Sequence, residues 1–231
     1  MHGNGGILLD IYPQCAKCET VYCVSSSMEE INKKLLPNFC PMRNAEQIIR
    51  SAQAIYGDEY MRKMYLASSI VEKRAYEVVG GRLMPVYPRI RELIEFCKII
   101  DAKKLGVAFC TGLNDEAARV VAVLEESGFT VLSVRCKCGA IDKTSLSVPR
   151  EYKIGDPSRY EAACNPIAQA QILNEARTDL NVIVGLCIGH DILFTMHSRA
   201  PVTTLIVKDR LLGHNPVIAL YSNYHKNIIK P

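Results

Sequence analysis

Four cysteines near the start of the chain have a spacing that suits a metal ion. They follow the pattern Cys15-x2-Cys18-x4-Cys23-x16-Cys40, and a proline comes directly after the last one. A C-x2-C turn can direct two thiolates at one ion, and two further thiolates complete a tetrahedral site. Zinc suits such an all-sulfur set. A [4Fe-4S] cluster suits it too, because the spacing is not that of a zinc ribbon and a Cys-Pro step occurs at the last ligand of ferredoxin-like clusters.

Five other cysteines are dispersed in the sequence but share one place on the expected sheet. Each lies at or beyond the carboxyl end of a strand, or at the start of a helix: Cys110, Cys136, Cys138, Cys164 and Cys187. In open parallel sheets, ligands bind at that edge. A single buried thiol is usually a small apolar side chain, and Cys97, at helical spacing with apolar residues, has that interpretation. Five thiols at one edge favour a functional site.

Other side chains of reactive types are expected at the same edge. They follow the third and fourth expected strands: His190, Asp191, Lys208, Asp209, Arg210 and His214. Helices that begin at Asn165 and His190 would lower the pKa of nearby thiols, because a helix N-terminus stabilises a thiolate.

The elements that position these residues alternate between short apolar strands and amphipathic helices. Strands are expected over residues 105–110, 130–134, 181–187 and 202–207, with helices between them. Strands that are apolar on both faces and alternate with helices indicate an α/β fold with a parallel, Rossmann-like sheet of about four strands. Residues 139–155 interrupt the alternation and are expected to form an irregular excursion or a hairpin.

The sheet is preceded by a helical segment and by the cysteine-rich module. Helices are expected over residues 44–56 and 59–79, the second ended by Gly80-Gly81, and a third helix follows Pro88. The organisation is therefore a metal-binding module over 1–43, a helical segment over 44–102 and a Rossmann-like domain over 103–231. The module has too little apolar sequence to form a core of its own, so a metal is expected to order it.

Composition limits the function classes further. The 231 residues contain ten cysteines and no tryptophan, with a net charge of +4 and no basic run mixed with aromatics, so nucleic-acid binding has no support. No apolar run is long enough to span a membrane, and the start lacks the features of a secretory signal. We therefore expect a cytoplasmic protein, in which abundant cysteines favour metal binding or thiol chemistry over disulfides. The dinucleotide fingerprint, the P-loop, G-x-S-x-G and H-E-x-x-H are all missing.

Several short strings resemble those of a family of prokaryotic proteins of unknown function, described as uncharacterised metal-binding proteins. The strings are CTGL at 110–113, CKCG at 136–139, CNP at 164–166, GLCIGHD at 185–191, VKDR at 207–210 and GHNP at 213–216. The N-terminal four-cysteine pattern is similar to theirs as well, so the resemblance extends over nearly the whole chain. It implies metal binding and a prokaryotic cytoplasm, and it implies no particular reaction.

Three hypotheses follow for the second thiol group. In the first, Cys110, Cys136, Cys164 and Cys187, with His190 nearby, hold a second metal or cluster, or perform thiol redox chemistry or sulfur transfer on a small ligand. Lys208, Arg210 and His214 would then position an anionic or sulfur-containing ligand.

In the second hypothesis, the protein is a hydrolase or transferase with a purely structural zinc. Cys187 or Cys164 is the nucleophile, His190 or His214 is the base, and Asp191 or Asp209 orients the base. In the third, the protein is a non-catalytic metal sensor or carrier. A module without its own core has to pack on the α/β domain of the same chain or on a second subunit, and we favour a homodimer.

Overall fold

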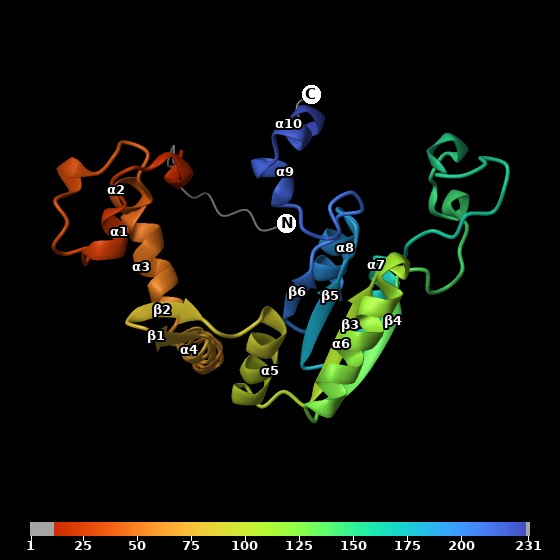
Figure 1. Ribbon diagram of the computed structural model, residues 1–231, viewed down its shortest axis with the longest axis horizontal. Helices are drawn as coiled ribbons and strands as arrows, with labels where there is room; N and C mark the ends of the chain where they lie inside the picture. The colour runs from red at the N-terminus through yellow and green to blue at the C-terminus, as the bar shows by residue number, and fades with distance from the viewer. Residues whose placement is uncertain (1–11, 230–231) are drawn as a thin grey trace. The chain divides into compact units, whose positions relative to one another are not determined.

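The computed structural model describes residues 12–229, and the chain divides into two compact units, Met1–Leu66 and Ala67–Pro231 (Figure 1). Residues 1–11 of the predicted metal module lie outside the described residues. The predicted boundaries after residues 43 and 102 differ from this division and stay predictions. No helix within residues 12–229 has the length and apolar character needed to cross a membrane.

Unit 1 consists of short helical turns and one longer helix. Its elements are η1 (Cys15–Lys17), α1 (Tyr22–Ser25), η2 (Lys33–Leu35), α2 (Pro41–Asn44), α3 (Glu46–Ile55) and the first half of α4 (Glu59–Arg74). Among its described residues, only Leu36 and Ala45 are buried. Two buried side chains are too few to hold a fold of this length together by the hydrophobic effect alone.

The helix predicted over 59–79 is wrong in its last part. The helix α4 ends at Arg74, and Tyr76–Val79 forms strand β1, which pairs antiparallel with β2 (Arg82–Pro85). Gly80 and Gly81 both have positive φ and form the turn of this hairpin, so they do not end a helix. Both central residues of a tight hairpin turn need positive φ, which glycine adopts without strain.

Unit 2 is built on four parallel strands, as predicted. They are β3 (Lys104–Phe109), β4 (Thr130–Arg135), β5 (Leu180–Val184) and β6 (Val202–Ile206), in the order β4-β3-β5-β6. Leu105 of β3 pairs with Val131 on one side and with Leu180 on the other. The chain therefore places β4 on one side of β3 and then returns to place β5 and β6 on the other side. This makes the gap between β3 and β5 the switch point of the sheet.

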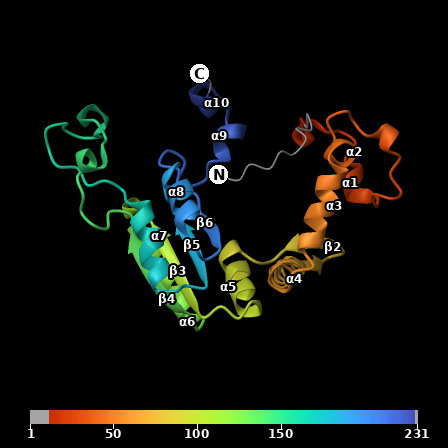
Figure 2. The same cartoon turned by 180° about the vertical axis from the view of Figure 1, so that it is seen from behind.

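Helices cover both faces of this sheet, as the two opposite views show (Figures 1 and 2). The helix α6 (Asn114–Glu126) lies on one face, and α7 (Pro166–Glu175) packs with α8 (His190–His197) on the other. The remaining helices of the unit are α5 (Arg89–Ile99), α9 (Ile218–Tyr221) and α10 (Asn223–Ile229). The guanidinium of Arg89 donates a 3.0 Å hydrogen bond to the carbonyl of Thr204 in β6, which ties α5 to the edge of the sheet.

An irregular excursion joins β4 to α7. It contains two short 3-10 turns, η4 (Lys143–Leu146) and η5 (Arg150–Tyr152), and one isolated bridge between Asp142 and Ala162. The carboxylate of Asp142 accepts hydrogen bonds from Thr144, from the Glu161 backbone N–H and from the buried Lys153 ammonium. These donors hold the pKa of Asp142 far below its usual range. Of the two alternatives, the irregular excursion is confirmed.

A buried polar side chain, that of Asn181, lies at the contact between β3 and β5. Asn181 is fully buried, accepts a hydrogen bond from Thr178 and donates one to Ser198, each of 2.8 Å. Its register partner Gly106 leaves room for this amide: a Cβ there would overlap Asn181 Oδ1 and lie 2.8 Å from Leu173 Cδ1. Glycine at position 106 is therefore required by the close approach of a hydrogen-bonded amide.

We predict that Gly106→Ala lowers the free energy of unfolding by about 2–4 kcal/mol, because the methyl group displaces a buried, hydrogen-bonded amide. Urea denaturation followed by circular dichroism measures the change. Gly155→Ala is the matched control, since a Cβ at Gly155 meets no atom within 4 Å, and it should change stability by less than about 0.5 kcal/mol. Equal effects of the two substitutions would contradict this account.

Candidate functional site

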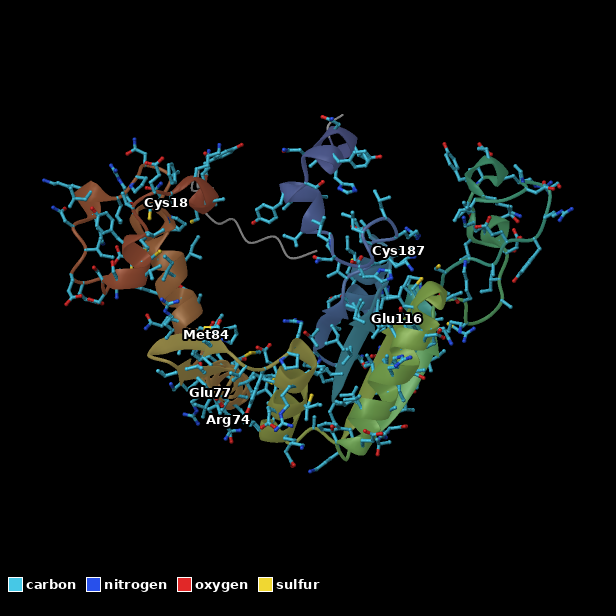
Figure 3. The ribbon with its side chains drawn as sticks, in the orientation of Figure 1. Cys18, Arg74, Glu77, Met84, Glu116 and Cys187 are labelled. Atoms are coloured by element: carbon cyan, nitrogen blue, oxygen red, sulfur yellow. The ribbon has the colours of Figure 1, made fainter. Side chains whose placement is uncertain are left out.

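The carboxyl edge of the sheet, at the switch point, holds most of the predicted thiol group. Cys110 directly follows β3, and Cys187 lies three residues after β5. Figure 3 labels Cys187 at this end of the sheet. Cys136 follows β4, and Cys164 precedes α7 by two residues. Three strand ends and one helix start thus each place a thiol at the same edge of the sheet.

These four thiols line one cavity of about 340 Å³. Its walls come from the strand ends, from the loop after β6 and from the excursion between β4 and α7. The polar lining residues are Cys110, Thr111, Cys136, Lys137, Lys143, Glu161, Cys164, Cys187, His190, Lys208 and Arg210. A cavity of this size is in the range of small-molecule binding sites.

Cys136 and Cys164 form the closest thiol pair of the cavity. Their sulfur atoms lie 3.7 Å apart, with the Cys164 thiol placed to donate to Cys136 or to accept from it. Backbone hydrogen bonds hold both residues in place. The N–H of Cys136 donates to the carbonyl of Phe109 at 2.9 Å, and the N–H of Asn165 donates to the carbonyl of Cys136 at 2.7 Å. The Thr111 N–H also donates to Cys136 Sγ at 3.3 Å.

The start of α7 fixes the position of Cys164. Asn165 caps the helix, with its side-chain oxygen accepting from the Ala168 N–H at 3.1 Å, and Pro166 is the first helical residue. One turn later, the buried amide of Gln169 donates to the carbonyls of Val134 and Phe109, at 2.6 and 3.3 Å. Gln169 therefore joins the helix to the two strand ends that lead to Cys110 and Cys136.

The environment of the cavity shifts the pKa values of Cys164 and Cys110 in opposite directions. The hydrogen bond from Cys136 and the nearby Lys137 ammonium lower the pKa of Cys164 to about 7. The hydrogen bond to Cys136 and burial raise the pKa of Cys110 to about 12. One thiolate can form readily among these thiols, since a second negative charge beside the first is unfavourable. Since its pKa is lowered, Cys164 is where we expect that thiolate.

Two cations approach the remaining thiols. Arg210 Nη2 lies 2.8 Å from Cys187 Sγ, a hydrogen-bonding distance. The Lys208 ammonium lies over Gly112, 2.9 Å from where a Cβ would stand, and it hydrogen-bonds Cys110. Glycine at position 112 thus leaves space for the lysine head group beside the thiols.

His190 lines the same cavity at the first position of α8. Burial is the main cause that lowers its pKa, so the imidazole is neutral at pH 7 and can accept a proton. Its backbone N–H donates to the carbonyl of Cys187 at 2.9 Å, which joins the two residues in one turn.

Four predicted site residues lie outside the lining of this cavity: Cys138, Asp191, Asp209 and His214. Cys138 Sγ faces the carbonyl of Asn165 at 3.9 Å, and burial raises the pKa of this thiol. Asp191 accepts a hydrogen bond from the N–H of Ile192, and His214 Nδ1 accepts one from the N–H of Asp209. These two side chains therefore stabilise local turns in the structure.

Sequence reasoning missed the wall that the excursion contributes. Lys143, Leu146, Val148, Ile154 and Glu161 all line the cavity, although they lie up to ten positions from the nearest predicted site residue in the chain. Lys143 and Glu161 form an ion pair of 2.6 Å. No motif marks these residues, and only the return of the chain from β4 to α7 could have suggested them.

The N-terminal thiols are arranged differently from the edge thiols. Cys15 and Cys18 share the turn η1, in which the Cys18 N–H donates to the carbonyl of Cys15 at 3.0 Å. The pKa of Cys18, a residue labelled in Figure 3, is lowered by hydrogen bonds from the Thr20 hydroxyl and from the backbone at Val21 and Thr20. Over residues 12–229, no group of three or more His, Cys, Asp or Glu side chains is placed so that it could hold a metal ion.

Comparison with known proteins identifies relatives without a known activity. A family described as "Protein of unknown function (DUF1847)" matches residues 40–205, a range that includes all five edge cysteines and, of the N-terminal four, only Cys40. The chain is also similar to the uncharacterized protein MJ0455 of Methanocaldococcus jannaschii. The two are 53% identical over 137 residues, which are 59% of this chain and 68% of that protein.

We predict that iodoacetamide alkylates Cys164 with a rate that rises between pH 6 and 8 and has its midpoint near pH 7, because the reactive species is the thiolate. Below pH 7 the rate falls as the sulfur is protonated. Mass spectrometry of quenched digests gives the rate for each cysteine separately.

Lys137→Gln should move this midpoint upward, since it removes a positive charge that favours the thiolate. In urea the midpoint should return to about 8.5, the value of an ordinary thiol. Cys97 and Cys110, with pKa values of about 12, should react slowly throughout. A midpoint for Cys164 in the folded protein equal to that in urea would contradict the assignment.

Proposed function

The chain belongs to the DUF1847 family of proteins of unknown function, and we propose that it uses Cys164 and Cys136 as a redox-active dithiol at the carboxyl edge of the sheet. The observation that carries this proposal is the 3.7 Å contact between the two sulfur atoms in a cavity open to a small molecule. Cys164 is the nucleophile and Cys136 is the resolving thiol.

The geometry suits a dithiol that cycles to a disulfide. A disulfide requires a sulfur separation of about 2.05 Å, and sulfurs in van der Waals contact can reach it through small side-chain rotations. The hydrogen bond between the pair favours the thiolate on Cys164, because a Cys164 thiolate would accept the proton of the Cys136 thiol. The pair therefore resembles other reactive dithiols, in which one thiol has a depressed pKa and its partner stabilises the thiolate.

The reaction consistent with this arrangement is the reduction of a small-molecule disulfide. The Cys164 thiolate attacks one sulfur of the substrate, the substrate S–S bond breaks, and one half leaves as a thiolate while the other half is bonded to Cys164. Cys136 then attacks Cys164 Sγ, which releases the second half as a thiolate and forms the Cys136–Cys164 disulfide. Two electrons pass from the dithiol to the substrate, and the two thiol protons end on the two products.

His190 can assist the second step. The neutral imidazole lines the cavity beside the thiols, so it can accept the Cys136 proton as that sulfur attacks and pass it to the departing thiolate. The reverse reaction, oxidation of a small thiol by the Cys136–Cys164 disulfide, uses the same residues by microscopic reversibility. Which direction operates depends on the redox potential of the partner couple.

We predict that mild oxidation of the reduced protein with diamide gives one dominant intramolecular disulfide, between Cys136 and Cys164, because their sulfurs are already in contact. Peptide mapping by mass spectrometry without reduction identifies the linkage. In Cys136→Ser protein treated with diamide in the presence of glutathione, Cys164 should be recovered as a mixed disulfide with glutathione, because diamide is reduced to its hydrazine as the S–S bond forms and the thiol in contact with Cys164 is missing.

Cys138→Ser is the matched control for this experiment, because it removes a thiol two residues away that does not line the cavity. It should leave the linkage unchanged. A dominant disulfide that joins Cys136 to Cys138, or the absence of any intramolecular disulfide at the sheet edge, would rule out the dithiol.

We further propose that the N-terminal cysteines hold a zinc ion or a [4Fe-4S] cluster with a structural role. The support is the spacing of Cys15, Cys18, Cys23 and Cys40, together with the hydrogen bonds that favour a thiolate on Cys18. A ligated metal would connect turns that otherwise bury only Leu36 and Ala45 among the described residues of unit 1.

Metal analysis of protein purified without oxygen tests this second proposal. We predict close to one zinc ion, or four irons with matching acid-labile sulfide, per chain, and the loss of this metal in the Cys15→Ser, Cys18→Ser double variant. Circular dichroism should show that unit 2 stays folded in the variant. Metal retained there but lost in Cys110→Ser, Cys187→Ser protein would place the metal at the sheet edge and overturn the assignment.

A further inference from the structure

The cavity around the dithiol has an excess of positive charge. Four cationic side chains line it, Lys137, Lys143, Lys208 and Arg210, against one carboxylate, that of Glu161. That carboxylate is paired with Lys143 at 2.6 Å. The other three cations are therefore balanced by at most one negative charge, a thiolate on Cys164. In a partly enclosed cavity the repulsion between these cations costs free energy, and a bound anion would relieve it.

The positions of these cations show where an anion would bind. Lys137 donates to the carbonyl of Ala162, so its ammonium is held by the excursion. Lys208 and Arg210 both come from the loop after β6, and they reach the cavity beside Cys110 and Cys187 respectively. An anionic group between these two side chains would lie next to the thiols, at the switch point of the sheet.

The wall contributed by the excursion is apolar where it faces the same cavity. Leu146, Val148 and Ile154 line it, and Leu146 and Ile154 keep 45% and 88% of their surface exposed. Apolar side chains at the rim of a cavity gain free energy when a ligand covers them. The volume of about 340 Å³ also exceeds what an inorganic sulfur anion would fill, so an organic ligand suits the site better.

We infer that the substrate of this site is an organic disulfide or thiol that carries an anionic group close to its sulfur and an apolar segment beyond it. Lys208 and Arg210 bind the anionic group, and Leu146, Val148 and Ile154 cover the apolar segment. This inference rests on the proposed dithiol chemistry, because it places the sulfur of the substrate beside Cys164.

Methanethiosulfonates of matched size but opposite charge test the anionic part. Each transfers an alkylthio group to the Cys164 thiolate and releases methanesulfinate, so the initial rate at Cys164 is measured by quenched mass spectrometry. The anionic 2-sulfonatoethyl and the cationic 2-(trimethylammonium)ethyl reagents are compared, with 2-mercaptoethanol as the reference for intrinsic reactivity. Relative to that reference, we expect the anionic reagent to be favoured at Cys164 by about tenfold or more.

Charge-removing variants show whether the two cations cause this preference. Lys208→Gln and Arg210→Gln should each reduce it by about tenfold, while the rate with the neutral methyl reagent changes by less than about threefold. Arg119→Gln is the matched control, since it removes the same charge from the exposed face of α6, outside the cavity lining. Raising the salt concentration should weaken the preference in the wild-type protein.

The length of the alkyl group tests the apolar part. We expect butyl methanethiosulfonate to react at Cys164 about tenfold faster than the methyl reagent, because three further methylenes are partly buried. Val148→Ser, Ile154→Ser protein should lose most of this difference. The neutral reagents leave the charge of the cavity unchanged, so the two parts of the inference are measured independently.

The outcomes separate this inference from the proposed function. If Cys164 reacts with no reagent faster than a thiol in the unfolded protein, the dithiol proposal fails and the substrate class fails with it. If Cys164 reacts rapidly with every reagent, but charge, chain length and the variants make no difference, the dithiol stands and the substrate class is overturned.

Discussion

The hydrogen bond from the N–H of Asn165 to the carbonyl of Cys136 closes the excursion between β4 and α7 and sets the geometry of the site. It brings the residue before the helix back to the residue after the strand, across 28 intervening positions of irregular chain. Cys164 and Cys136 come within 3.7 Å as a direct consequence. The same closure brings Glu161, and with it the excursion, to the wall of the cavity.

This closure depends on the sheet below it. The carbonyl of Phe109 accepts from the N–H of Cys136 and from the amide of Gln169, so the end of β3 fixes both the end of β4 and the second turn of α7. Gln169 is fully buried, and its side-chain oxygen has no partner among the described residues. An unpartnered buried acceptor costs free energy. The fold tolerates that cost at the place where two strands and a helix have to be held in register beside the thiols.

Much of the sheet could be predicted from the sequence because its signals are local. All four strands are short and largely apolar runs, and two residues, Asn165 and the proline after it, mark the start of α7. The switch point then follows from strand order, which places Cys110 and Cys187 at one edge. The sequence does not reveal the hairpin of β1 and β2, because the residues of β1 continue the apolar pattern of α4. The Gly80-Gly81 pair also suits a helix end as well as a tight turn.

The site itself could be predicted only in part, because its walls depend on irregular backbone. The excursion is held by the charges and hydrogen bonds around Asp142, a pattern with no period that a sequence reveals. The difference between Cys136 and Cys138 also has no local sign in the sequence. The two thiols of one C-x-C string have different surroundings, because the first contacts Cys164 and the second faces a backbone carbonyl.

The two thiol groups of this protein therefore follow different physical rules. The N-terminal set is defined by spacing along the chain, and in neither set, within residues 12–229, are three side chains placed so that they could hold a metal ion. The edge set is defined by strand order, and the fold brings its members together without a ligand. The family match covers the whole edge set but only Cys40 of the N-terminal set. The edge thiols are positioned by the sheet of unit 2 and the N-terminal cysteines lie in unit 1, so the two sets can be altered one at a time.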